Sequence, residues 1–219
     1  DFENSFDSEW ARKRGMEIEL DGQGQVIGPA SFELIQPFVG NFGKERSPRL
    51  STAQELCAET EAVLAKKHKR FNKMLLVVDS IPAMLPEYEA EAGLEGRNMR
   101  TQMDLPMFLS SLLRRWIGLS QSYNVLILLV NQLRASPNSF KPEYTPGGNA
   151  LRFYSHVRVR MRRAKGGTVR DKGKIIGMQG YITNIKNKSG SREGCRVGFK
   201  IFWDGPMEFL PADELEKAE

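Results

Sequence analysis

Two short apolar runs in the chain lack the alternation of polar and apolar residues that marks a half-buried strand. Residues 74–78 end abruptly at Asp79-Ser80. Residues 125–130 end just as abruptly at Asn131-Gln132. Such runs are typical of central strands in a parallel sheet that is covered on both faces.

Polar residues at the two strand ends indicate a ligand site, because ligands bind at the carboxyl ends of parallel strands. We expect Asp79 to hold Mg²⁺ through water and Gln132 to sense a phosphate beyond it. For either residue alone, the better explanation is a polar residue at a point where the chain turns outward. The two together favour the ligand site.

Apolar residues at helical spacing predict helices before and between these strands. The first covers residues 9–14 and is closed by Gly15, the residue type that most often ends a helix. The second begins after Thr52, which forms a capping-box pattern with Glu55. The third runs from residue 104 to about residue 122.

The remaining segments complete a fold of the α/β class, with a mostly parallel central sheet flanked by helices and joined by right-handed crossovers. A short strand is expected at residues 32–36, a loop at 40–49 and a mobile loop at 87–100.

The last third of the chain alternates polar and apolar residues with period two and predicts an antiparallel extension at the sheet edge. Its expected strands are 156–162, 178–186 and 197–203. We expect one core domain at residues 1–210 and a frayed helical tail at 211–219.

The composition favours one soluble domain. Apolar residues make up 40% and charged residues 27% of the 219 residues, and no apolar run approaches the ~18 residues of a membrane span. The net charge is +5, with basic residues gathered late in the chain, which suggests a polyanionic partner or else a solvated cationic face. Cys57 and Cys195 are not part of a Cys/His pattern that could bind zinc. A reduced intracellular compartment is the simplest interpretation.

A long loop follows the second strand, from Arg134 to Tyr154. A loop of this length in a compact domain is usually functional or disordered. Gly147 and Gly148 can let the backbone approach a phosphate closely, and the arginines supply positive charge. Because the loop starts beside Gln132, a ligand that binds the loop could affect the strand tip.

At these residues the chain resembles the core of the RecA recombinase family. The resemblance extends over nearly the whole chain, and the run from Gly147 to Tyr154 is its most specific part. Arg152 stands where bacterial members commonly have lysine, which keeps the charge and changes the geometry. The matching segments are Asp1–Asp7, Trp10–Lys13, Asp79-Ser80, Asn131–Arg134, Gly147–Tyr154 and Lys186–Lys188.

The resemblance implies a RecA-like P-loop NTPase core that uses ATP and Mg²⁺. Glu3 would activate the water that attacks the γ-phosphate, and Asp79 and Ser80 would organise Mg²⁺ and nucleotide. Gln132 would couple phosphate to DNA, and Phe153 would relay that state across a subunit interface. The remaining implied nucleotide ligands are Lys186 and Lys188, which would reach a neighbouring subunit's nucleotide. A solvated sheet edge is the less favoured alternative.

The resemblance also implies single-stranded and double-stranded DNA as partners, a helical homo-oligomeric filament and no membrane. The first DNA-binding loop would span residues 89–103, and the second would span 134–149. The cytoplasm of a bacterial or phage-infected cell would be the location. The implied DNA-binding residues are Arg114, Arg134, Gly147, Gly148, Asn149, Arg162 and Arg163.

Two departures qualify the resemblance. The phosphate-binding pattern Gly-x-x-x-x-Gly-Lys-Ser/Thr is absent, because the glycines and lysine of residues 40–44 have the wrong spacing and no hydroxyl residue follows. We therefore expect weak or no ATP binding by this chain alone, and a core fragment of a longer recombinase. Residues 16–50 also exceed the usual bacterial connection, which would fit a divergent or phage-type member.

Three functions are compatible with these observations. The first is an ATP-dependent recombinase that forms filaments on single-stranded DNA and catalyses strand exchange in recombination and repair. The second is a non-catalytic accessory paralogue, which the missing phosphate loop would explain. The third is a hexameric replicative helicase, which shares the strand ending at Asp79 but not the run from Gly147 to Tyr154.

Overall fold

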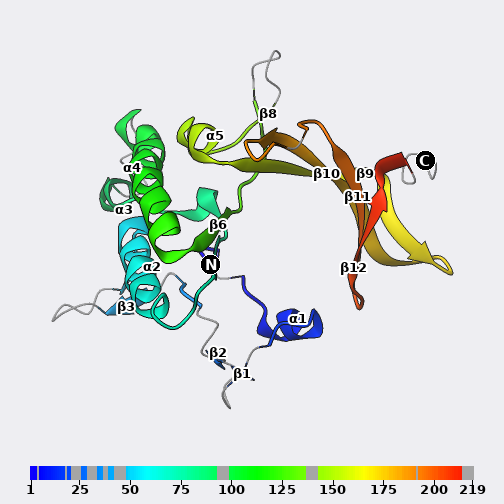
Figure 1. The fold of residues 1–219 in the computed structure, drawn as a ribbon, viewed down its shortest axis with the longest axis horizontal. Helices are drawn as coiled ribbons and strands as arrows, with labels where there is room; N and C mark the ends of the chain where they lie inside the picture. The colour runs from blue at the N-terminus through cyan, green and yellow to red at the C-terminus, as the bar shows by residue number, and fades with distance from the viewer. Residues whose placement is uncertain are drawn as a thin grey trace. The chain divides into compact units, whose positions relative to one another are not determined.

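The chain forms two structural units in the computed structural model, which we describe in turn (Figure 1). The first contains Asp1–Asp7 and Leu20–Tyr154, and the second contains Ser8–Glu19 and Ser155–Glu219. Within the described part of the chain, no helix combines the length and apolarity needed to cross a membrane. The structure describes residues 1–3, 5–17, 19–20, 26–28, 34–36, 39–41, 48–92, 99–136, 143–190 and 192–213.

The first unit is organised around two parallel strands, β5 (Met74–Val78) and β6 (Val125–Leu129). Both predicted strands are confirmed, and they pair in register from Met74 opposite Val125 to Val78 opposite Leu129. Three helical segments connect them, and α2 (Ala53–Lys67) precedes β5. The connecting segments are η1 (Ile81–Ala83), α3 (Glu87–Ala92) and α4 (Met99–Tyr123).

One face of the β5–β6 pair is packed and the other is exposed. Val78 is buried in the core, and Ile127 packs against it from β6. On the opposite face Leu126 is 70% exposed, and Leu75, Val77 and Leu128 are exposed as well. The prediction of strands covered on both faces is therefore wrong for the described residues. Both α2 and α4 contribute to the core beneath the packed face, so neither helix covers the opposite face of the β5–β6 pair.

Helices α2 and α4 supply most of that core. Side chains of α2 and α4 pack with residues that follow β5 and with Leu151 of α5 (Ala150–Tyr154). The capping box predicted at the start of α2 is present, since Glu55 N donates to Thr52 Oγ1 at 3.3 Å and Thr52 N donates to Glu55 Oε2 at 2.8 Å. The buried core residues are Ala53, Cys57, Val78, Ile81, Met84, Leu109, Leu112, Leu113, Trp116 and Leu151.

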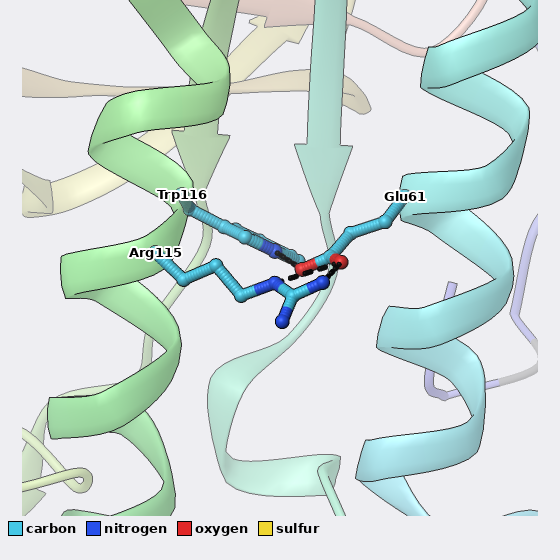
Figure 2. A network of polar contacts seen from close by, with 3 residues as sticks. All are labelled: Glu61, Arg115 and Trp116. Carbon is cyan, nitrogen blue, oxygen red and sulfur yellow. Dashed lines mark hydrogen bonds and ion pairs between the residues drawn. The ribbon is translucent and has the colours of Figure 1, made fainter.

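A carboxylate ties α2 to α4 at the edge of this core (Figure 2). Glu61 accepts from Arg115 Nε at 2.9 Å and from the indole Nε1 of Trp116 at 3.1 Å. The indole is buried, so this bond satisfies a donor that would otherwise be stranded away from water. Burial raises the pKa of the Cys57 thiol to about 12, and the negative charge of Glu61 is the smaller cause. The thiol therefore stays protonated.

Several local predictions need correction. Leu34–Gln36 forms no strand, while Phe32 and Glu33 lie outside the described residues. The ends of the predicted loop at 40–49 form a short antiparallel pair, β3 (Val39–Asn41) with β4 (Pro48–Leu50). Elsewhere β1 (Glu19–Leu20) and β2 (Val26–Gly28) are two further short strands.

The predicted loop at 87–100 is also partly helical. Residues 87–92 form α3, and α4 begins at Met99 rather than at residue 104. Pro106 therefore lies inside α4, which the sequence analysis had placed near a helix start. The first predicted DNA-binding loop, 89–103, thus consists of helix at both ends, and residues 93–98 lie outside the described residues.

The second unit contains a four-stranded antiparallel sheet in the order β12-β11-β10-β9. The antiparallel character predicted for the last third is confirmed. In the part of the chain that the structure describes, these strands hydrogen-bond only to one another rather than to the edge of the β5–β6 pair. Their bounds are β9 (Val157–Asp171), β10 (Lys174–Asn187), β11 (Arg196–Phe202) and β12 (Met207–Pro211).

The short helix α1 (Ser8–Lys13) belongs to the second unit and confirms the first predicted helix. Gly15 follows it with φ +88°, the left-handed conformation expected at a helix end. The Arg14 guanidinium donates to the backbone carbonyls of Phe202 and Gly205, which secures α1 to the end of β11. Of the predicted tail, Pro211 ends β12 and residues 214–219 lie outside the described residues.

Gly147 is a packing position of the first unit. It is buried with φ +94°, and a Cβ at this position would lie 2.6 Å from Leu109 Cδ1 and 2.9 Å from Leu151 Cδ1. Real Cβ atoms do not approach other carbons so closely. Glycine is favoured here by its backbone conformation, and a Cβ would also have to displace the ends of two packed leucine side chains.

We expect Gly147→Ala to lower the free energy of unfolding by about 2–4 kcal/mol, because backbone strain and crowding against Leu109 act together. The matched control is Gly190→Ala, since Gly190 has φ +91° but nothing within 4 Å of an added Cβ. Urea denaturation of both variants measures the difference. Equal losses in the two variants would show that crowding at Gly147 contributes nothing.

Candidate active site

The tips of β5 and β6 lie together because their backbone pairing continues past the strands. Val130 N donates to Val78 O at 2.9 Å, and Ile81 N donates to Val130 O at 3.0 Å. Asp79-Ser80 and Asn131-Gln132 therefore leave the sheet at the same edge. The sequence analysis predicted this neighbourhood from the two polar strand ends.

The amino-terminal segment brings Glu3 to the same edge. Phe2 packs against the core and its N–H donates to Asp79 O at 2.5 Å, which places the next residue beside the strand tips. Ser80 Oγ donates to Glu3 Oε1, and Gln132 Nε2 donates to the same oxygen at 3.3 Å. Three predicted site residues from distant parts of the sequence thus share one carboxylate oxygen.

A residue that the sequence analysis did not single out, Asp1, shapes the segment that carries Glu3. Its carboxylate accepts from the backbone N–H groups of Glu3 at 3.1 Å, Ser5 at 2.9 Å and Phe6 at 2.9 Å. It also accepts from Gln36 Nε2 at 2.8 Å. An acidic side chain followed by several polar residues is a common signal for a turn closed by its own side chain, and it was available in the sequence.

The site is partly buried and oxygen-rich. Ser80 is 1% exposed, Asp79 is half-buried, and Glu3 and Gln132 are exposed. No group of three or more His, Cys, Asp or Glu side chains gathers into a metal site among the residues described. Mg²⁺ needs less than that, because it keeps several waters and takes one or two carboxylates together with substrate phosphates. The Asp79 and Glu3 carboxylates and the Ser80 hydroxyl are donors of the kind that Mg²⁺ accepts.

The predicted second DNA-binding loop, 134–149, is joined directly to this site. Its described ends form a short antiparallel pair, β7 (Arg134–Ala135) with β8 (Glu143–Tyr144), and residues 137–142 lie outside the described residues. Asn131 Nδ2 donates to Pro146 O at 3.0 Å, while Asn131 Oδ1 accepts from Gln132 N at 2.8 Å. Asn131 therefore clamps both ends of the hairpin beside Gln132, a role that the sequence analysis missed.

The run from Gly147 to Tyr154 divides into packed and exposed positions. Gly147 is buried against α4, so of the two predicted glycines only Gly148 has an exposed backbone. Asn149 and Arg152 are exposed, and Phe153 is 68% exposed although it is aromatic. Packing thus accounts for part of this specific run, at Gly147 and Leu151.

The other predicted residues lie on α4 or in the second unit. Arg114 is exposed on α4, where its Nε donates to Ser110 O at 3.2 Å. Arg162 and Arg163 are exposed on β9. Lys186 lies in β10, and Lys188 follows the strand with its N–H donating to His156 O at 2.9 Å. The pairing with β9 ends at Asn187, so Lys188 lies one residue beyond the strand that holds Lys186.

Comparison with known proteins gives the family. Residues 62–203 match the model of the RecA N-terminal domain, which is well over half of the chain. The chain belongs to the RecA family. The resemblance seen in the sequence is thereby confirmed, and the fold is that of a RecA N-terminal domain with mixed helix and sheet.

Individual RecA proteins match a shorter region. The chain is 37% identical over 116 residues to Protein RecA of Rhodospirillum rubrum, and this region covers 52% of the chain and 30% of that protein. It is 35% identical to Protein RecA of Gluconobacter oxydans and 36% identical to that of Syntrophus aciditrophicus, each over 116 residues that cover 52% of the chain. The matched region is 32% of each of these two relatives.

The family match includes some site residues and omits another. Asp79, Gln132 and the run from Gly147 to Tyr154 lie inside residues 62–203, as do Lys186 and Lys188. Glu3 lies outside the matched region. Its place in the site therefore rests on its hydrogen bonds to Ser80 and Gln132.

Proposed function

We propose that this RecA-family chain is the core of a DNA-dependent ATPase and homologous recombinase with a P-loop NTPase architecture. The observation that carries the proposal is the shared Glu3 oxygen, which Ser80 and Gln132 both contact. A carboxylate at the carboxyl ends of parallel strands is suitably placed to act on water near a bound phosphate. Gln132 connects the same carboxylate to the hairpin that starts at Arg134.

In this proposal Glu3 is the general base for hydrolysis of ATP. It would accept a proton from the water that attacks the γ-phosphate, and Asp79, with Ser80, would hold Mg²⁺ through water. Mg²⁺ would supply charge neutralisation on the phosphate oxygens. Donation from Ser80 and Gln132 holds the Glu3 carboxylate in one position. A movement of Gln132 would remove one of these bonds and let the carboxylate turn toward the attacking water.

DNA contact at the hairpin is the proposed cause of that movement. Arg134, Gly148 and Asn149 would contact the phosphate backbone of single-stranded DNA on this loop, with Gly147 as the packed pivot that positions them. The clamp by Asn131 is the mechanical link, because it holds Pro146 on one side and Gln132 on the other. DNA occupancy would thereby be transmitted to the hydrolytic carboxylate. Arg114, Arg162 and Arg163 are further proposed phosphate contacts.

Assembly into a filament is the last part of the proposal. Phe153 has a large exposed aromatic surface, as expected of a residue that is covered by a neighbouring subunit. Lys186 of β10 and Lys188 just after it would reach the nucleotide of that neighbour and stabilise charge in the transition state. Strand exchange between single-stranded and double-stranded DNA would take place in this filament.

A non-catalytic accessory paralogue is the second candidate function. It is favoured by one observation, the absence from residues 1–219 of the Gly-x-x-x-x-Gly-Lys-Ser/Thr pattern that cradles phosphates. In that case Glu3 and Asp79 would take no part in hydrolysis, and DNA binding would be the activity of the protein. ATP hydrolysis by the full-length protein distinguishes the two functions.

We expect Glu3→Gln in the full-length protein to reduce kcat for ATP hydrolysis in the presence of single-stranded DNA by about 10²–10⁴-fold, the usual contribution of a general base. Glu59→Gln is the matched control, because Glu59 is exposed on α2 in the same unit. Steady-state phosphate release with and without DNA is the measurement. Full activity in the Glu3 variant would exclude it as the base, and no hydrolysis by the wild type would favour the accessory paralogue.

We expect Arg162→Ala to weaken DNA binding to a similar extent on every sequence, since a phosphate contact carries no sequence information. The slope of log K against log salt concentration should fall in magnitude by about 0.7–0.9, the value of one released counterion. Arg12→Ala changes the net charge equally and lies on α1, so it serves as the control. Fluorescence anisotropy with several oligonucleotides measures both quantities, and a loss confined to one sequence would contradict the phosphate role.

A further inference from the structure

Glu3, the carboxylate at the centre of the candidate site, lies in a turn rather than in a helix or a strand. Its side chain is exposed, so packing does not fix the direction in which it points. Phe2 N donates to Asp79 O at 2.5 Å, which fastens the turn to the end of β5. A catalytic group on a turn needs further support from neighbouring residues if it is to keep a productive geometry.

The Asp1 carboxylate supplies this support by closing the turn around Glu3. Its Oδ1 accepts from the backbone N–H of Glu3 at 3.1 Å. Its Oδ2 accepts from the backbone N–H groups of Ser5 and Phe6, each at 2.9 Å. One side chain thus holds the backbone of Glu3 and the backbone that follows it.

A second segment holds Asp1 itself. Gln36 Nε2 donates to Asp1 Oδ2 at 2.8 Å, and Asp1 N donates to Ile35 O at 2.7 Å. All three residues are partly buried, so water competes less for these bonds than it would at an exposed turn. Ile35 and Gln36 lie within residues 16–50, the segment that exceeds the usual bacterial connection and to which the proposed function gives no role.

These contacts occupy the Asp1 carboxylate. An ionised carboxylate only accepts hydrogen bonds and offers about four lone pairs. Four described N–H groups use them, three from the backbone and one from Gln36. Asp1 therefore differs from Asp79 and Glu3, because its oxygens face donors of the protein itself rather than a ligand.

We propose that Asp1 and Gln36 are positioning residues for hydrolysis. Asp1 holds the turn that aims Glu3 at the attacking water, and Gln36 holds Asp1. The backbone at Glu3 determines where its carboxylate lies, and a displacement of about 1 Å in such a group can cost about 100-fold in rate. The inference rests on the proposed function, since it assumes that Glu3 is the general base.

The test measures kcat and KM for ATP in hydrolysis by the full-length protein with single-stranded DNA. Asp1→Asn keeps the shape of the side chain but replaces one oxygen by an NH₂ group, which cannot accept from an N–H. We expect kcat to fall by about 10- to 100-fold because Glu3 is misplaced, with KM within about twofold of the wild-type value because Asp79 and Ser80 are unchanged. Glu9→Gln removes the same charge from an exposed position of α1 and should hydrolyse ATP as the wild type does.

Gln36→Leu keeps the inference testable if Asp1→Asn disturbs the fold. It removes one of the four donors and leaves the backbone bonds to Asp1 in place, so we expect kcat to fall by about threefold without a change in KM. Both substitutions are then repeated in Glu3→Gln, where no base remains to be positioned and each should change the residual rate by less than about twofold. Equal losses in both backgrounds, or a loss through KM alone, would overturn the positioning role.

The outcome also separates this inference from the proposed function. If Glu3→Gln lowers kcat while Asp1→Asn and Gln36→Leu leave it unchanged, Glu3 remains the base and the positioning role is refuted. If Glu3→Gln hydrolyses ATP at the wild-type rate, the general base is excluded and the inference is refuted with it.

Discussion

The parallel pairing of β5 with β6 is the constraint on which the first unit depends. Register from Met74–Val125 to Val78–Leu129 puts two chain segments that are far apart in sequence at one edge, and the backbone bonds of Val130 and Ile81 extend this order past the strands. The packed face of the pair anchors α2 and α4, which in turn hold Gly147 and Leu151. A change in register by one residue would separate Ser80 from Gln132 and reverse the buried and exposed faces of a strand.

This pairing brings two hydrogen-bond donors, Ser80 and Gln132, to the same oxygen of Glu3. Glu3 Oε1 accepts from a buried hydroxyl that the strand holds in place and from an exposed amide at the base of a hairpin. The first donor is fixed by packing, whereas the second lies on the surface, where a ligand on the hairpin can reach it. An arrangement with one buried and one exposed donor is well suited to link ligand occupancy with the orientation of a carboxylate.

The elements that sequence could predict are those with strong local signals. The β5 and β6 runs, the capping box at Thr52 and the helix ended by Gly15 depend on neighbouring residues, and all of them are confirmed. The bare face of the β5–β6 pair could not be predicted, because Leu126 and Val78 are equally apolar and only tertiary packing distinguishes them. The helical ends of the segment 87–100 were missed because its charged composition resembles that of a loop.

Site residues divide in the same way. The nearness of Ser80 and Gln132 follows from strand topology, and so could be predicted. The turn closed by Asp1 has a local signal in the sequence, whereas the contributions of Asn131 and Gly147 depend on contacts between segments that no local pattern connects.

The most direct test of the central claim, that Gln132 acts through Glu3, is a double-mutant cycle on single-stranded-DNA-dependent ATP hydrolysis by the full-length protein. Glu3→Gln, Gln132→Ala and the double variant are compared with the wild type for the ratio of kcat with and without DNA. The account predicts that Gln132→Ala has almost no effect on this ratio once Glu3 has been replaced. If the effects of the two substitutions multiply, Gln132 acts independently of Glu3 and the claim is contradicted.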